Sequence, residues 1–137
     1  MKIISHRGNL KGRSNQENHP DHITTALQKG LDCEIDLWVT DNTYFLGHDK
    51  PQYEVKKSFL TKKGLWIHCK NLKALEKVPT QSNFFWHQND DFTLTSKGYI
   101  WTFPTKNLLK NSVIVDTTED WKNKNYNCFG VCADYIL

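Results

Sequence analysis

The stretch CEIDLWVTDNTYFLGHD, residues 33–49, holds two carboxylates inside a segment that otherwise has the composition of a buried β-strand. Residues 33–40 are mostly apolar or β-branched, without glycine or proline, and Glu34 and Asp36 interrupt them. Side chains alternate between the two faces of a strand, so both carboxylates point the same way. Because burying two like charges side by side is costly, the stretch predicts a positive charge next to them.

Two sources of that charge remain open from these residues alone. Both carboxylates can share a hard, oxygen-seeking cation such as Mg²⁺ or Ca²⁺, which removes their mutual repulsion. They can instead pair with Arg7 and Lys70 in a buried ion network. The acid pair by itself favours neither explanation.

The rest of the chain is typical of strands joined by short connections. Predicted strands are residues 2–5, 33–40, 65–70, 84–87, 99–103, 113–116 and 129–134, predicted helices are 21–29 and 72–78, and 43–47 forms a returning hairpin arm. Strand and helix alternate at the start, which indicates parallel βαβ units. We therefore expect the α/β class: a single domain, residues 1–137, folded as a compact, reduced TIM-type (β/α) barrel. It would have about seven core strands, a hairpin after the second strand and few, short outer helices, since a full barrel usually needs about 250 residues.

Composition and charge limit the classes of function. The formal net charge of +3 over 137 residues suits an anionic substrate, but it falls short of the basic stripe typical of nucleic-acid-binding proteins. No apolar run has the length of a membrane span or a signal peptide, so we expect a cytoplasmic protein. The four cysteines form no CxxC pair, and Cys33 and Cys69 are expected to be small buried hydrophobes.

Polar residues follow several of the predicted strands at the point where each strand ends. They are His6 and Arg7, His48 and Asp49, His68 and Lys70, His87 and Asp90, and Asp116. In an α/β barrel the active-site groups lie at the carboxyl ends of the strands, so these side chains are expected to meet at one open mouth.

Four short motifs, taken in order, resemble the glycerophosphodiester phosphodiesterase family, within the phosphatidylinositol-phospholipase-C-like barrels. They are His6-Arg7-Gly8, Glu17-Asn18, Glu34-Ile35-Asp36 and His48-Asp49. The resemblance covers the first 50 residues, and beyond them only residues 99–103 and 130–135 are similar to late strands of the family. Where the family has Glu-x-Lys this chain has His68-Cys69-Lys70, and the chain is shorter than is usual in the family.

The resemblance implies a set of site residues and a metal cofactor. It gives His6 and His48 as the general acid and base, and Arg7, Lys70 and Trp101 as the phosphate- and substrate-binding residues. It gives Glu34, Asp36, Glu17 and His68 as the metal site, with Glu17 either completing the metal shell or orienting Arg7. The implied ion is Mg²⁺ or Ca²⁺. Imidazole suits these ions poorly, so His68 leaves three alternatives open: a replacement oxygen from Asp90 or Asp116, a softer ion such as Mn²⁺ or Zn²⁺, or loss of the metal.

The implied activity is metal-dependent hydrolysis of a glycerophosphodiester or a similar small phosphodiester. The alternative is a catalytically impaired protein that binds phosphate esters on the same barrel, and a third, weaker hypothesis is a lysophospholipase-D-like activity on lipids. The expected partner is a small phosphodiester substrate, without nucleic acid or a membrane span. We expect a monomer or a homodimer, the latter because a shortened barrel leaves strands exposed.

Overall fold

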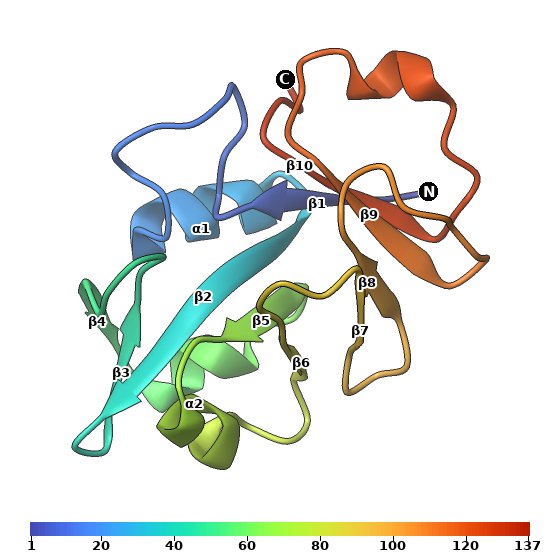
Figure 1. The fold of residues 1–137 in the computed structure, drawn as a ribbon. Coiled ribbons are helices and arrows are strands. Elements are labelled where there is room, and N and C mark those ends of the chain that lie inside the picture. Colours follow the sequence, from blue (N-terminus) through green and yellow to red (C-terminus); the bar gives the residue numbers. More distant parts are fainter.

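The computed structural model describes residues 1–137 as one curled, mixed β-sheet of ten strands with two α-helices (Figure 1). The strands are β1 (Lys2–His6), β2 (Asp32–Thr40), β3 (Thr43–Leu46), β4 (Tyr53–Val55), β5 (Leu65–Cys69), β6 (Asn83–Trp86), β7 (Phe92–Leu94), β8 (Ile100–Thr102), β9 (Ser112–Asp116) and β10 (Gly130–Ala133). The helices are α1 (Pro20–Gln28) and α2 (Leu72–Lys77), with 3₁₀ turns at Lys57–Thr61 and Trp121–Lys124.

Parallel pairing runs through the centre of the sheet in the order β6-β5-β2-β1-β10-β9-β8. Three strands are antiparallel: β3 pairs with β2, β4 with β3, and β7 with β8. Strand β2 has nine residues and pairs with neighbouring strands along both of its edges. Its first residues pair with β1, its last residues pair with β3, and β5 lies along the opposite edge. The long β2 therefore sets the acid pair at the centre of the sheet.

The expected reduced TIM-type barrel with few, short outer helices is wrong, because the sheet is a curled half-barrel and not a closed barrel. Only the connections β1–β2 and β5–β6 contain an α-helix, and the other links between parallel strands are β-arms, 3₁₀ turns or loops. The sheet also stops short of a closed ring of paired strands. Between β6 and the β7 hairpin the contacts are single bonds, such as those to the carbonyl oxygens of Phe84 and Trp86. The fold is a mostly-β half-barrel, because the second half of the chain lacks helix-forming connections that would wrap the outside.

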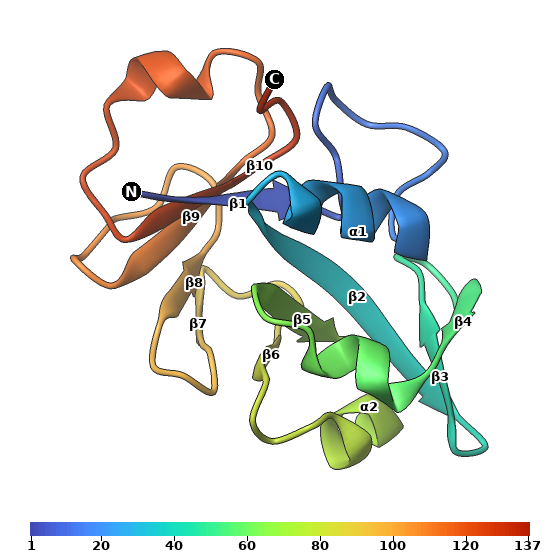
Figure 2. The ribbon, with the colours of Figure 1, turned by 180° about the vertical axis from the view of Figure 1, so that it is seen from behind.

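The two faces of the curled sheet pack differently. Both helices cover the outer face of β2 and β5, as Figure 2 shows from behind. There the largest apolar cluster includes Cys33 and Cys69, which are buried and unpaired, in agreement with the sequence. The inner face carries a second cluster that we call the apolar floor: Ile4, Trp66, Phe85, Trp101, Val113 and Cys132. Its rings pack closely, with the centroids of Phe85 and Trp101 4.6 Å apart.

Neither α-helix has the length and apolar composition needed to cross a membrane.

Candidate functional site

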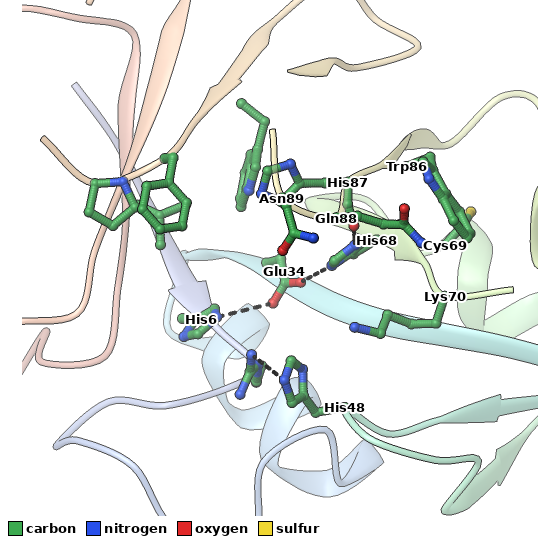
Figure 3. Close-up of a pocket in the computed structure, with 15 residues that line it drawn as sticks. His6, Glu34, His48, His68, Cys69, Lys70, Trp86, His87, Gln88 and Asn89 are labelled. Atoms are coloured by element: carbon green, nitrogen blue, oxygen red, sulfur yellow. Dashed lines mark hydrogen bonds and ion pairs between the residues drawn. The ribbon is translucent and has the colours of Figure 1, made fainter. Parts of the chain in front are cut away.

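Four of the inward-facing strands add a polar residue beyond the apolar floor. Since side chains on one face recur every second residue, Ile4 is followed by His6, Trp66 by His68, Phe85 by His87 and Cys132 by Asp134. We call this upper layer the polar mouth and define it as His6, Glu34, Asp36, His68, His87 and Asp134. It opens into a cavity of about 400 Å³ whose lining includes His6, Arg7, Glu34, His48, His68 and Lys70 (Figure 3).

Glu34 and Asp36 are buried together beneath this cavity, 2% and 0% exposed. Asn18 clamps Asp36: its side-chain nitrogen donates to Asp36 Oδ2 at 2.9 Å, and its side-chain oxygen accepts from the Asp36 backbone N–H at 2.9 Å. The other oxygen, Asp36 Oδ1, has no hydrogen-bond partner, and neither has Glu34 Oε1. Two buried carboxylate oxygens without hydrogen-bond donors are costly, and the nearest basic groups are imidazoles: His68 Nδ1 lies 3.2 Å from Asp36 Oδ1 and His6 Nε2 lies 4.0 Å from Glu34 Oε1.

The environments of the two acids move their pKa values apart. Burial and the neighbouring Asp36 raise the pKa of Glu34 well above its usual value. Although burial opposes it, contacts with His48, His68 and Arg7 lower the pKa of Asp36 well below its usual value. The surroundings of Asp36 therefore favour its anionic form, and those of Glu34 favour its neutral form.

His68 lies against both acids. Its Nε2 is 2.9 Å from the carbonyl oxygen of His87, while its Nδ1 is 3.2 Å from Asp36 Oδ1 and 3.9 Å from Glu34 Oε2. One ligand atom from each of Glu34, Asp36 and His68 fits within 4.8 Å of the others, which suits a shared metal ion. With the unpartnered oxygens, this arrangement could hold a divalent metal ion, as the family resemblance implies.

His6 is held by a carboxylate from the far end of the chain. Its Nδ1 is 2.8 Å from Asp134 Oδ1, which also accepts a hydrogen bond from Asn9 Nδ2 at 2.9 Å. This leaves Nε2 free on the cavity side, 4.0 Å from Glu34 Oε1. A carboxylate on Nδ1 fixes the ring tautomer and makes Nε2 a better proton acceptor. Asp134 is the last residue of the predicted strand 129–134, and no role was predicted for it.

His48 reaches the site from the loop after β3. Only glycine fits at Gly47, because a Cβ there would collide with the carbonyl oxygen of Lys50, and the Gly47 carbonyl is anchored by Trp38 Nε1 at 2.7 Å. His48 Nδ1 then lies 3.5 Å from Asp36 Oδ2, and Nε2 lies 3.3 Å from Arg7 Nη2. The loop thus brings His48 to the cavity that His6 lines.

Arg7 turns into the site on strained backbone. Its φ of 57° is left-handed, which is uncommon outside glycine, and its backbone N–H donates to the Glu34 carbonyl oxygen at 2.9 Å. Arg7 Nε is 3.3 Å from Asp36 Oδ2, and Arg7 Nη1 is 3.4 Å from Glu17 Oε1. Burial opposes its charge, but Glu34, Asp36 and Glu17 together raise the pKa of Arg7.

The remaining predicted residues take varied positions. Glu17 also accepts from Asn9 at 2.6 Å and lies outside the three-ligand group, so the structure places it on Arg7 rather than with the acid pair. Lys70 lines the cavity, as does Trp101, whose ring belongs to the apolar floor. Asp116 is fully engaged elsewhere by Thr118, Lys124 and Tyr126.

His87 and Asn18 are site residues to which the sequence analysis gave no functional role. His87 lines the cavity and supplies the carbonyl that holds His68, and the only sequence signal was its place at a strand end. Asn18 was visible within the Glu17-Asn18 motif, and its left-handed φ of 65° is a conformation that asparagine tolerates well.

Fold and site together define a curled, largely parallel sheet with a buried acid–imidazole cluster at its mouth. Comparison of the chain with protein-family models, with curated proteins and with solved structures gave no match. The resemblance to glycerophosphodiester phosphodiesterases therefore stays a prediction from the four motifs.

Proposed function

We propose that the protein hydrolyses a small phosphodiester of the glycerophosphodiester type with His6 and His48 as proton-transfer groups. The observation that carries the proposal is the shared cavity: both imidazoles, Arg7, Lys70 and the buried acid Glu34 face the same space. Imidazoles titrate near neutral pH, so each can accept or donate a proton at low cost.

The two histidines have surroundings suited to opposite roles. His6, with Nδ1 on Asp134 and Nε2 toward the cavity, acts as the general base that takes a proton from the attacking water. His48, whose Nδ1 lies 3.5 Å from Asp36 Oδ2, donates a proton to the leaving oxygen. The water oxygen forms a bond to phosphorus as the bond between phosphorus and the leaving oxygen breaks, which yields a phosphomonoester and an alcohol.

Arg7 and Lys70 bind the phosphate in this proposal. Both cationic side chains line the cavity, and Arg7 is oriented by Glu17 and Asp36. Glu34, Asp36 and His68 would hold a divalent cation, which would supply further positive charge near the phosphate. The pairing of Arg7 with Asp36 alone leaves Glu34 Oε1 without a partner, which favours a cation over a protein-only ion network.

The direct test is hydrolysis of glycerophosphocholine, glycerophosphoethanolamine and a nitrophenyl phosphodiester, each with Mg²⁺, Ca²⁺, Mn²⁺ or Zn²⁺. We expect His6→Ala to lower turnover by about 10²- to 10⁴-fold, because the general base is lost. The matched control is His19→Asn, because His19 lies outside the cavity and Asn can keep its acceptor bond to the Asp21 backbone N–H. Unchanged turnover in His6→Ala, or an equal loss in His19→Asn, refutes the proposal.

A second candidate function is binding of phosphate esters without turnover. The observation that favours it is the 3.2 Å separation of His68 Nδ1 and Asp36 Oδ1, since a protonated His68 provides a built-in positive charge in place of a cation. This candidate predicts inorganic phosphate binding in the absence of metals and no hydrolysis of any diester. A cytoplasmic location and a monomeric or homodimeric state remain predictions under either function.

A further inference from the structure

The two ring nitrogens of His68 have different partners, and this fixes what each can do. The carbonyl oxygen of His87, 2.9 Å from Nε2, can only accept, so Nε2 carries the proton. In the neutral ring Nδ1 then presents its lone pair, and this lone pair faces Asp36 Oδ1 and Glu34 Oε2. A histidine that donates one N–H to a backbone carbonyl and aims the other nitrogen at carboxylates has the usual arrangement of a metal ligand.

The carboxylates of Glu34 and Asp36 also have oxygen atoms without hydrogen-bond partners that could bind a metal ion. Asn18 engages only Oδ2 of Asp36, so Oδ1 is left free on the side of His68. Glu34 Oε1 is a second buried, unpartnered oxygen and lies on the side of His6, while Glu34 Oε2 is the oxygen nearer His68, 3.9 Å from its Nδ1. Both residues are at least nine-tenths buried. Ligand atoms about 2.1 Å from one ion lie about 3.0–3.4 Å apart in octahedral or tetrahedral geometry, and the 3.2 Å between His68 Nδ1 and Asp36 Oδ1 falls in this range.

No other carboxylate replaces His68 as the third ligand. Asp116 accepts four hydrogen bonds in its own loop, from the Thr118 backbone and hydroxyl, Lys124 and Tyr126. Asp90 is exposed, and neither acid belongs to the three-ligand group. The ligand set of this chain therefore contains one nitrogen and two carboxylates.

We infer that His68 coordinates the cation through Nδ1 and that the site selects a borderline transition-metal ion, Mn²⁺, Co²⁺ or Zn²⁺, over Mg²⁺ and Ca²⁺. Mg²⁺ and Ca²⁺ favour all-oxygen ligand sets, whereas imidazole nitrogen suits the transition ions. The inference rests on the proposed function only in that both use the same cation. Metal binding is measured without substrate, so its outcome is independent of any failure to find hydrolysis.

The test is pulsed electron paramagnetic resonance of metal-stripped protein reloaded with Mn²⁺, with affinities for Mn²⁺, Zn²⁺ and Mg²⁺ from calorimetry. In the wild type we expect one bound Mn²⁺ with nitrogen modulation from a directly bonded imidazole. In His68→Gln the modulation should vanish and the Mn²⁺ affinity should fall by about tenfold or more, since even indirect ligand supports are worth that much. His68→Glu should raise the affinity for Mg²⁺ relative to Mn²⁺, because it makes the ligand set all-oxygen.

His19→Asn serves as the control and should leave modulation and affinity unchanged. The inference is overturned by an absence of bound metal, by bound Mn²⁺ without nitrogen modulation, or by modulation that persists in His68→Gln and so comes from another histidine. The wild-type measurement needs no variant, and far-ultraviolet circular dichroism shows whether each variant is folded. If His68→Gln is unfolded, His68→Glu provides the same loss of nitrogen modulation.

Discussion

The same strands build the apolar floor and the polar mouth, but the floor is closely packed whereas the mouth contains buried polar atoms without hydrogen-bond partners. Four of these strands each supply an apolar residue to the floor and, two positions later, a polar one to the mouth, as Trp66 and His68 do on β5. The floor is closely packed, with the rings of Trp66 and Tyr99 5.1 Å apart. The mouth leaves carboxylate oxygens of Glu34 and Asp36 without donors.

This difference separates the residues that stabilise the fold, in the floor, from the residues that form the candidate site, in the mouth. Burying aromatic surface stabilises the folded chain by about 25 cal/mol per Å², whereas burying an unpaired carboxylate destabilises it. The packing of the floor can therefore offset the cost of burying these carboxylates, and under the proposed function a bound cation or substrate would offset it further. Changes in the floor should alter stability, and changes in the mouth should alter binding.

The largest effect is expected from Trp66→Ala in the floor. Trp66 is 3% exposed, contacts the rings of Tyr99, Trp101 and Phe129, and donates from Nε1 to Asp32 Oδ2 at 2.9 Å. Removing the ring leaves a cavity, so the free energy of unfolding should fall by about 3–5 kcal/mol in urea titrations. Trp66→Phe is the matched control. It keeps an aromatic ring and should cost less, mainly the lost hydrogen bond of about 1 kcal/mol and some packing. Equal costs for both variants would mean that ring packing does not hold the floor.

The sequence predicts the strands and the faces of their side chains better than it predicts whether the sheet closes into a barrel. The alternation in residues 33–40 places Glu34 and Asp36 on one face, and the predicted strands lie within a residue or two of the observed ones. The predicted barrel fails because closure requires the two ends of the sheet to pair, and β6 meets the β7 hairpin only through single bonds, which no local pattern indicates. Strands β4, β7 and β8 each have three residues, too few to show a period. Only β8 was predicted, because it lies in the aromatic and β-branched run YIWTF, whereas polar and charged residues flank β4 and β7.

In the candidate site, too, some residue positions could be predicted from the sequence, whereas some contacts could not. Residues at strand ends, such as His6 and His68, could be expected at one mouth from the parallel arrangement alone. The partner of His6 could not, because Asp134 lies 128 positions away and its role depends on β10 pairing with β1. The carbonyl of His87 is a backbone group, so no side-chain motif could have indicated its bond to His68.

The next effect in size concerns the clamp on Asp36. Asn18→Gly keeps the left-handed backbone accessible and removes both side-chain bonds to Asp36. A support of this kind is worth about 10- to 100-fold in metal affinity, so Mn²⁺ binding by calorimetry should weaken by that factor. Asn9→Ala, which removes support from Glu17 and Asp134 instead, is the comparison and should affect Mn²⁺ less. A larger loss of Mn²⁺ affinity in Asn9→Ala would place the metal on the other side of the mouth.

The smallest effect is a change in the slope of stability against pH caused by Glu34. Burial raises its pKa above the usual 4.5, so from pH 4.5 upward to the raised value the folded state binds more protons than the unfolded state. The free energy of unfolding then falls as pH rises, by at most about 1.4 kcal/mol per pH unit from this group. Glu34→Gln cannot titrate, so in the presence of a chelator the variant should gain stability relative to the wild type between pH 4.5 and 8. Asp36 acts in the opposite sense, because its lowered pKa makes its contribution disappear only below its usual 3.8.

Added Mn²⁺ should reverse the order of the two proteins at neutral pH. The cation replaces the proton on Glu34 and stabilises only a site that keeps both carboxylates, so the wild type should unfold at higher urea concentration than Glu34→Gln. If Glu34→Gln is the more stable protein at pH 8 with saturating Mn²⁺ as well as with chelator, Glu34 does not bind the cation. The cost of burying it would then have to be recovered by the substrate alone.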